Sequence, residues 1–188
     1  MSYEKFDVTK LERLNDPARL ERIPPDALWA ALGDPAAETI VEIGAGTGLY
    51  AEQFALVCPG AVVYAADIEP SMVDYMNTHR GSVVPLLVQE TSVPLPDAEA
   101  DAVVMINLHH ELVDPAATYR EARRLLHPGG VVLVTDWAPG GDSGPPQEIR
   151  ATGEHIGEML AQAGFDTITV HDPLPTHSLV TGRKADLG

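Results

Sequence analysis

The segment Glu42–Gly48, Glu-Ile-Gly-Ala-Gly-Thr-Gly, constrains the fold of this chain more than any other feature. It follows an apolar run typical of a buried strand, 39–43, and opens a longer run typical of a helix, 47–58. Alternating glycines let a backbone turn tightly and approach a ligand closely. The amino terminus of the helix adds unpaired N–H groups, which suit an anionic group such as a carboxylate. The segment therefore predicts a strand–turn–helix unit with a ligand at its glycines, although the same residues could form a tight turn without one.

Strand-like and helix-like segments alternate along the rest of the chain. Further strands are predicted at 61–66, 82–89, 101–106, 131–135, 165–170 and 177–181, and helices at 70–79, 114–126 and 152–163. This alternation predicts an α/β fold with a doubly wound, mostly parallel seven-stranded sheet. Pro85 favours an edge position for its strand, because proline cannot donate a ladder hydrogen bond. The link 171–176 is too short for a crossover helix, so the last two strands should pair antiparallel.

The length of 188 residues favours one domain overall, in which residues 39–188 bind the ligand. Residues 1–38 fit neither pattern. Their amphipathic pieces, 8–15 and 26–32, predict a helical cap over the carboxyl end of the sheet. His127–Gly130 predicts a turn, and the glycines and prolines of 138–146 predict a mobile loop. The cap and the loop at 138–151 would gate the site and exclude water.

Charge and composition exclude several classes of partner. Twelve Lys and Arg against 28 Asp and Glu give a net charge of −16. Nucleic acids bind clustered basic residues, so no nucleic-acid partner is expected. No apolar run approaches the roughly 18 residues of a membrane span, and the first ten residues lack a signal peptide's apolar stretch. The single cysteine, Cys58, excludes an internal disulfide framework, so a cytoplasmic monomer or homodimer is expected.

Asp67 ends the second predicted strand, 19 residues after Gly48. A carboxylate at this point can accept two hydrogen bonds from a ribose diol. The dinucleotide fingerprint G-x-G-x-x-G/A fails when counted from Gly44 and passes when counted from Gly46. Because the predicted strand ends at Ile43, the first count is favoured. The pattern therefore favours a mononucleoside ligand, and NAD stays open.

Five segments in chain order resemble the motifs of class I S-adenosylmethionine-dependent methyltransferases. They are 41–48, 66–72, 89–97, 125–130 and 163–165. More narrowly, 107–111, Asp136-Trp137 and 144–150 resemble the small ubiquinone/menaquinone-methyltransferase-like proteins of uncharacterised substrate. The resemblance implies a Rossmann-like methyltransferase fold with an antiparallel last strand. It also implies S-adenosylmethionine as the cofactor.

The same resemblance implies which residues hold the methionine part of that cofactor. The backbone of the glycine loop would cradle it, through Gly44, Ala45, Gly46 and Gly48. Glu42 would lie beneath it, and Asn107, at the end of the fourth strand, would face the sulfonium.

Other residues would hold the adenosine part. Asp67 would bind the ribose hydroxyls, and Ile68 would pack on the adenine. Glu90 and the backbone N–H of Thr91 would recognise the adenine edge. Met72 closes the second motif and joins this set, although its helical spacing with Tyr75 and Met76 is more typical of packing than of function.

Polar and aromatic residues after the fourth and fifth strands are candidates for the acceptor side. They are His110, Glu111, Asp136, Trp137 and Arg150. Since the carboxyl ends of parallel strands share one edge, these groups should converge on one pocket with His109 and Glu148. Alternatives stay open. The histidines could form a polar turn, Trp137 could be a core residue, and Arg150 could pair with Glu148 or Glu154 instead of an acidic substrate. No metal is expected, because no H-x-x-x-H or H-x-H spacing occurs there.

Methyl transfer is an in-line displacement, so the protein mainly has to hold nucleophile and methyl group in line. A base helps only where the acceptor is protonated, and His110 is the natural candidate because its ordinary pKa lies near neutrality. We therefore expect a methyltransferase acting on an unidentified small molecule. Two alternatives are an NAD-dependent oxidoreductase, for which no Tyr-x-x-x-Lys pair is found, and a non-catalytic S-adenosylmethionine-binding protein.

Overall fold

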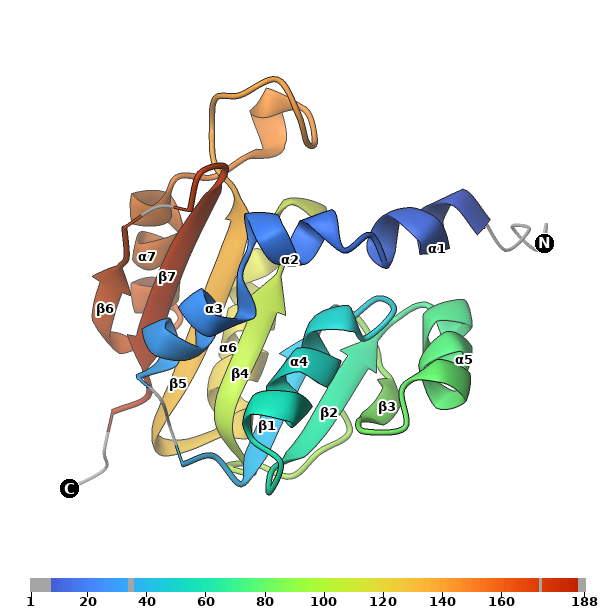
Figure 1. Ribbon diagram of the computed structural model, residues 1–188. Helices are drawn as coiled ribbons and strands as arrows, with labels where there is room; N and C mark the ends of the chain where they lie inside the picture. Colours follow the sequence, from blue (N-terminus) through green and yellow to red (C-terminus); the bar gives the residue numbers. More distant parts are fainter. Residues whose placement is uncertain (1–7, 34–35, 173, 186–188) are drawn as a thin grey trace.

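The computed structural model describes residues 8–33, 36–172 and 174–185. Seven strands form one sheet in the order β3-β2-β1-β4-β5-β7-β6 (Figure 1). The strands are β1 Thr39–Ile43, β2 Val62–Asp67, β3 Val84–Leu87, β4 Ala100–Ile106, β5 Leu126–Trp137, β6 Asp166–Val170 and β7 His177–Arg183. The first five are mutually parallel, and β7 runs antiparallel to both β5 and β6. This arrangement confirms the predicted fold class, the edge position of the strand with Pro85 and the antiparallel pairing of the last two strands.

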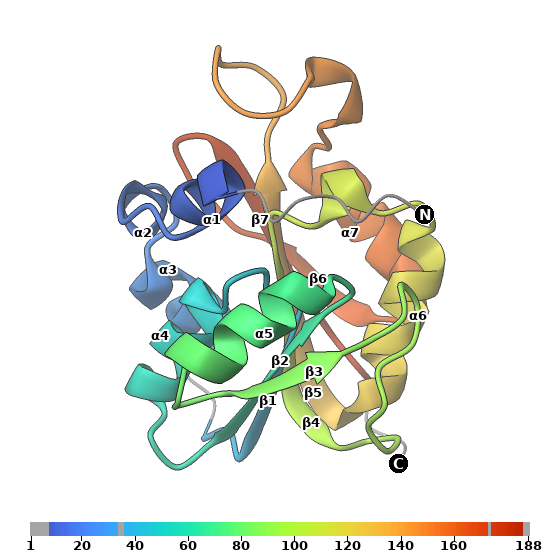
Figure 2. The ribbon, with the colours of Figure 1, turned by 90° about the vertical axis from the view of Figure 1, so that its right-hand side faces the viewer.

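Helices cover both faces of the sheet (Figure 2). One face carries α3 Pro25–Leu32, α4 Leu49–Val57 and α5 Pro70–His79, and the other carries α6 Pro115–Leu125 and α7 Gly153–Gln162. Side chains alternate along each strand, so Val104 joins one core cluster and Val103 the other. Both faces are therefore apolar, as a buried parallel sheet requires.

The two helices of the second face begin at the capping residues that the sequence indicates. Asp114 accepts a hydrogen bond from Ala117 N at 2.9 Å, with Pro115 as the first helical residue. Thr152 accepts one from His155 N at 3.2 Å. Local capping chemistry thus fixes where these elements begin.

The predicted turn at 127–130 is wrong, because β5 continues through this segment. Leu126 pairs with Ala100, and the register then shifts so that Val131 pairs with Ala102. The extra residues form a bulge that is hydrogen-bonded to the end of β7. Gly129 N donates to Lys184 O at 2.8 Å, and Lys184 N donates to Gly130 O at 2.9 Å.

The N-terminal segment divides between two positions. Helices α1 Val8–Leu14 and α2 Ala18–Arg22 lie beyond the carboxyl ends of the strands (Figure 1). Helix α3 instead packs on a face of the sheet, where Leu28 and Leu32 are buried in the core. The predicted placement of 26–32 over the carboxyl end is therefore wrong, because its apolar face is needed against α4 and β5. Residues 1–7 of the predicted cap lie outside the described residues.

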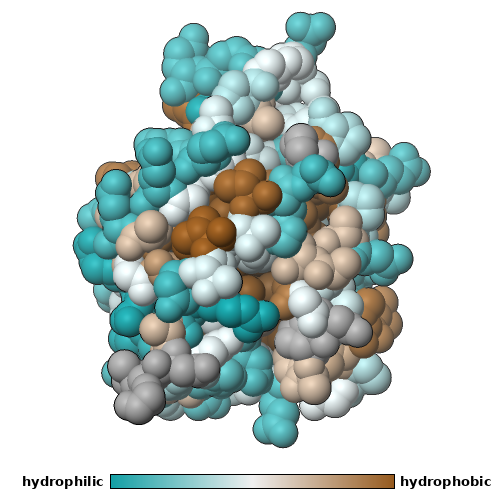
Figure 3. Space-filling view, turned by 90° about the vertical axis from the view of Figure 1, so that its left-hand side faces the viewer, coloured by the Kyte–Doolittle hydropathy of each residue, from teal (hydrophilic) through white to brown (hydrophobic). Residues whose placement is uncertain are grey.

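Seen from the edge formed by β6, the surface is mostly hydrophilic, with a small group of hydrophobic side chains near its centre (Figure 3). Within the described ranges, no helix is long and apolar enough to cross a membrane.

Candidate active site

A cavity of about 870 Å³ opens at the carboxyl edge of the sheet. Its walls come from α1 and α2, from the loops after β1, β2 and β4, and from the end of β5 with the loop that follows. This volume is within the range of about 300–1,000 Å³ that is usual for small-molecule sites. Most of the predicted site residues line it, namely Glu42, Gly44, Ala45, Gly46, Asp67, Ile68, Met72, Glu90, Asn107, His110, Glu111 and Trp137. Among the described residues, Gly48, Thr91, Asp136 and Arg150 lie outside this lining.

The glycine loop has the backbone geometry that its sequence predicts. Gly44, Gly46 and Gly48 have φ angles of +74°, +55° and +71°, a region that favours glycine. A Cβ atom on Gly44 would lie only 2.6 Å from Cδ1 of Leu108. Gly48 immediately precedes α4 and does not line the cavity, whereas Gly44 and Gly46 do. The loop begins directly after β1, which supports the count that starts at Gly44.

Asp67 ties this loop to the end of β2. It is 8% exposed, and its Oδ2 accepts a hydrogen bond from Gly46 N at 2.6 Å. Its Oδ1 accepts one from Glu69 N at 2.9 Å. A carboxylate can accept about four hydrogen bonds, so ribose hydroxyls can add to those that it already accepts.

Two buried oxygens of the cavity wall, Glu42 Oε2 and Asn107 Oδ1, have no hydrogen-bond partner among the described residues. Burial raises the pKa of Glu42 to about 8, although the Arg19 guanidinium opposes this shift. Asn107 has a φ of +56°, which is a strained conformation for a residue other than glycine. Unpartnered acceptors suit a cationic ligand group. S-adenosylmethionine carries an ammonium and a sulfonium, so these residues fit the expected cofactor.

The expected adenosine side of the wall combines apolar side chains with the acidic residues Asp67 and Glu90. Ile68 is 59% exposed and lines the cavity. Met72 also lines it, but most of its side chain is buried. Glu90 Oε1 accepts a hydrogen bond from Val113 N at 3.1 Å, which holds the loop after β4. Thr91 is exposed and lies outside the lining, so a role for its backbone N–H stays a prediction.

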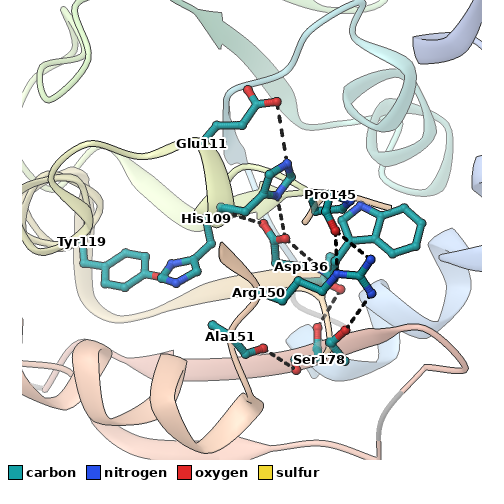
Figure 4. Close-up of polar contacts among 12 residues, drawn as sticks. His109, Glu111, Tyr119, Asp136, Pro145, Arg150, Ala151 and Ser178 are labelled. Carbon is teal, nitrogen blue, oxygen red and sulfur yellow. Dashed lines mark hydrogen bonds and ion pairs between the residues drawn. The ribbon is translucent and has the colours of Figure 1, made fainter. Parts of the chain in front are cut away.

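His110 is held between two carboxylates (Figure 4). Its Nδ1–H donates to Oδ1 of the fully buried Asp136 at 2.7 Å, and its Nε2 lies 3.7 Å from Oε1 of Glu111. Burial alone would lower the pKa of His110, but the hydrogen bond and the charge of Asp136 outweigh it and raise the pKa. Asp136 therefore lies behind the wall and orients the imidazole, which leaves Nε2 as the ring's acceptor atom.

His109 points away from the cavity, contrary to the prediction that it joins the pocket. Its Nδ1 lies 2.7 Å from the hydroxyl of the buried Tyr119, and the two rings lie end to end with their planes 11° apart (Figure 4). Burial lowers the pKa of His109. Across residues 8–33, 36–172 and 174–185, no group of three or more His, Cys, Asp or Glu side chains could hold a metal ion.

Trp137 lines the cavity from the end of β5. Its ring lies 4.3 Å from that of His177, which is buried and was not predicted. Burial lowers the pKa of His177 to about 4. A Cβ on Gly144, where φ is +100°, would lie 2.6 Å from the Trp137 ring. Trp137 is thus both packed and exposed to the ligand space.

Arg150 has neither of its two predicted roles. It lies outside the cavity lining, where an acidic substrate would bind, and it forms no ion pair with Glu148 or Glu154. Its five N–H donors contact loop carbonyls within 3.3 Å (Figure 4). The accepting oxygens belong to Ala138, Gly140, Ser143 and Pro145. Glu148 is exposed and does not line the cavity. Composition predicts a mobile loop, but the contacts of Arg150, together with those of the Gln147 amide to Gly140 and Gly141, organise it.

Three arginines that the sequence reasoning missed form part of the wall: Arg13, Arg19 and Arg22. They come from the first two helices, in a segment without a recognisable motif. Burial lowers the pKa of Arg19, whose Nη1 donates to Leu14 O at 2.7 Å. No signal in the sequence marks these residues, because only the fold brings them to the cavity.

Comparison with known proteins agrees with this geometry. Residues 41–134, half of the chain, match the methyltransferase domain family. An uncharacterised methyltransferase of Mycobacterium tuberculosis is 38% identical over 157 residues, which are 81% of this chain and 60% of that protein. The ubiquinone/menaquinone biosynthesis C-methyltransferase of Caulobacter vibrioides is 30% identical over 131 residues, which are 63% of this chain and 52% of that protein. The chain thus spans about 60% of the first of these relatives and about half of the second.

A solved structure extends the match over almost the whole chain. The S-adenosylmethionine-dependent methyltransferase from Aquifex aeolicus has a TM-score of 0.84 and 29% identity, with 95% of this chain and 98% of that chain covered. These findings favour a methyltransferase over the oxidoreductase alternative. With the matched domain and the cavity described above, they show that the chain belongs to the class I S-adenosylmethionine-dependent methyltransferase family.

Proposed function

We propose that this protein transfers the methyl group of S-adenosylmethionine to a small-molecule acceptor. The observation that carries the proposal is one cavity in which unpartnered acceptors, Glu42 Oε2 and Asn107 Oδ1, share the wall with His110. The net charge of −16 and the cavity volume of about 870 Å³ support a small acceptor over a nucleic acid. We also propose a cytoplasmic protein, monomer or homodimer, consistent with its single cysteine.

The residues that would hold the cofactor lie on one side of the cavity. Gly44, Ala45 and Gly46 leave room for its methionine part, and Glu42 and Asn107 offer oxygens to its positive groups. Asp67, Ile68, Met72, Glu90 and the backbone N–H of Thr91 would hold the adenosine. Gly48 would contribute through its positive φ, which shapes the loop. Of residues 1–38, we assign the capping role to α1 and α2.

When bound, the cofactor would supply an electrophilic methyl carbon for the acceptor's electron pair, with its sulfur as the leaving group. His110 Nε2 accepts the proton that a protonated acceptor releases, which typically contributes about 10²–10⁴-fold in rate. Asp136 holds the ring and stabilises the resulting imidazolium. Glu111, near Nε2, favours that same charged form. Trp137 and the loop organised by Arg150 position the acceptor, and alignment can supply about 7–11 kcal/mol.

Calorimetric titration with S-adenosylmethionine, S-adenosylhomocysteine and NADH tests the cofactor assignment. We expect the first two to bind saturably, NADH not to bind, and Asp67→Asn to weaken binding of both. Asp74→Asn, an exposed acid on α5, is the matched control and should bind like the wild type. Binding of NADH alone would refute the proposal.

Turnover is tested with methyl-labelled cofactor and a panel of phenols, carboxylic acids and amines. Transfer of label to an acceptor, reduced in His110→Gln while S-adenosylhomocysteine affinity is kept, supports the proposal. Cofactor binding without transfer to any member would instead favour a non-catalytic binding protein.

A further inference from the structure

Two arginines of the cavity wall have no hydrogen-bond or ion-pair partner among the described residues, although the chain is strongly acidic. They are Arg13 and Arg22. Elsewhere, Arg80 pairs with Glu52 and Arg124 pairs with Glu121 and Asp97. Arg13 and Arg22 are both exposed, so their guanidinium groups are open to solvent and to a ligand in the cavity.

Arg22 lies on the acceptor side of the cavity. Its guanidinium carbon is 6.0 Å from the centre of the Trp137 ring, and Trp137 shares the wall with His110. Arg19 lies on the cofactor side, because its guanidinium contacts the ring of Tyr50 at 5.4 Å and its charge acts on Glu42. The two arginines of α2 therefore face different parts of the ligand space.

Acidic side chains of the wall are concentrated on the cofactor side, at Asp67, Glu69, Glu90 and Glu42, and the last of these is mostly protonated near pH 7 in the ligand-free protein because burial raises its pKa to about 8. The remaining acids are Asp16, which accepts from Ala18 N at 2.9 Å, and Glu111 beside His110. A protein of net charge −16 repels anions at long range, so an anionic ligand needs local cations in its site. A guanidinium beside an aromatic face suits a planar ligand that carries a carboxylate or phosphate, because arginine both pairs with such groups and stacks.

Building on the proposed function, we propose that the methyl acceptor is a small planar anion. Its carboxylate or phosphate pairs with Arg22, and its ring lies against Trp137. Arg22 is thus a specificity-determining residue that selects charged acceptors over neutral ones.

Calorimetry on the protein saturated with S-adenosylhomocysteine tests this inference. The probes are 4-hydroxybenzoate and phenyl phosphate as anions, and 4-hydroxybenzamide as a neutral counterpart of similar shape. We expect at least one anion to bind about tenfold or more tightly than the amide. Arg22→Gln should remove that preference. Arg120→Gln, which changes the net charge equally at an exposed position of α6, should retain it.

A second arm asks whether Arg22 holds the carboxylate of the cofactor instead. S-adenosylhomocysteine carries that carboxylate and 5′-methylthioadenosine does not. If Arg22→Gln weakens the binding of S-adenosylhomocysteine but not that of 5′-methylthioadenosine, the assignment of Arg22 to the acceptor is wrong. Three other results would also overturn the assignment. The anions and the amide could bind equally tightly, neither anion could bind, or the Arg22→Gln variant could keep the preference for anions. Failure of the wild type to bind S-adenosylhomocysteine at all would instead count against the proposed function.

Discussion

Replacement of Glu42 by glutamine should stabilise the protein and weaken its cofactor site. In the folded protein without ligand, burial raises the pKa of Glu42 from an ordinary 4.5 to about 8. The folded state therefore keeps a proton that the unfolded chain releases above pH 4.5, and stability falls as pH rises towards 8. At about 1.4 kcal/mol for each pH unit, the neutral carboxyl costs the folded state about 3 kcal/mol at pH 7.

Urea unfolding of ligand-free protein between pH 4.5 and 8 measures this effect. Glu42→Gln should unfold with a free energy up to about 3 kcal/mol above that of the wild type near pH 7, and the difference should vanish near pH 4.5. Glu158→Gln, an exposed change on α7, is the control and should show no such trend. A difference that does not vary with pH would refute the argument.

The same residue links cofactor binding to proton release. A cationic ligand group beside Glu42 favours the carboxylate, so binding of S-adenosylmethionine near pH 7 should release up to one proton from the wild type. Titrations in buffers of different ionisation enthalpy measure this release. The variant should release less and bind more weakly, which would make Glu42 a site where stability is given up for function.

Three further predictions concern the acceptor side. Since Asp136 raises the pKa of His110, Asp136→Asn should lower kcat and move the rising limb of the rate–pH profile to lower pH; an unmoved limb contradicts the pairing. Arg150→Gln removes contacts to loop carbonyls, so limited proteolysis should cut 138–149 faster while S-adenosylhomocysteine affinity is kept; unchanged cleavage means that the loop does not need the arginine. Gly144→Ala would place a methyl group 2.6 Å from Trp137, so acceptor KM should rise several-fold without a change in cofactor affinity; a normal KM excludes Trp137 as an acceptor contact.

The parts of the site that the sequence predicts are those governed by local chemistry. Gly44 and Gly46 are needed because their φ angles are positive, and that demand is visible in the sequence itself. Asp67 and Asn107 follow from position, because each lies at the carboxyl end of a parallel strand. Strand and helix locations follow from apolar periodicity and from caps such as Asp114.

The parts that the sequence does not predict depend on contacts between distant segments. His109 and His110 are adjacent in the sequence, yet His109 is hydrogen-bonded to Tyr119 and His110 to Asp136. No local pattern indicates which of the two histidines faces the cavity. Arg22 and His177 reach Trp137 only because α2 and β7 are folded against β5. The turn expected at 127–130 is absent because the end of β7 supplies partners for its backbone.

The loop after β5 is shaped by its carbonyl oxygens and one arginine that follows it in the chain. Carbonyls are common to all residues, so the loop's shape depends little on which side chains it carries, apart from glycines with positive φ such as Gly144 and from Gln147, whose amide is hydrogen-bonded to the backbone of Gly140 and Gly141. Ser143, Pro145 and Ile149 line the cavity from this loop. These three positions can therefore be varied, by evolution or in a directed library, while the conformation is retained. Acceptor preference in this protein should be open to change at little structural cost, provided that Arg150 and Gln147 are kept.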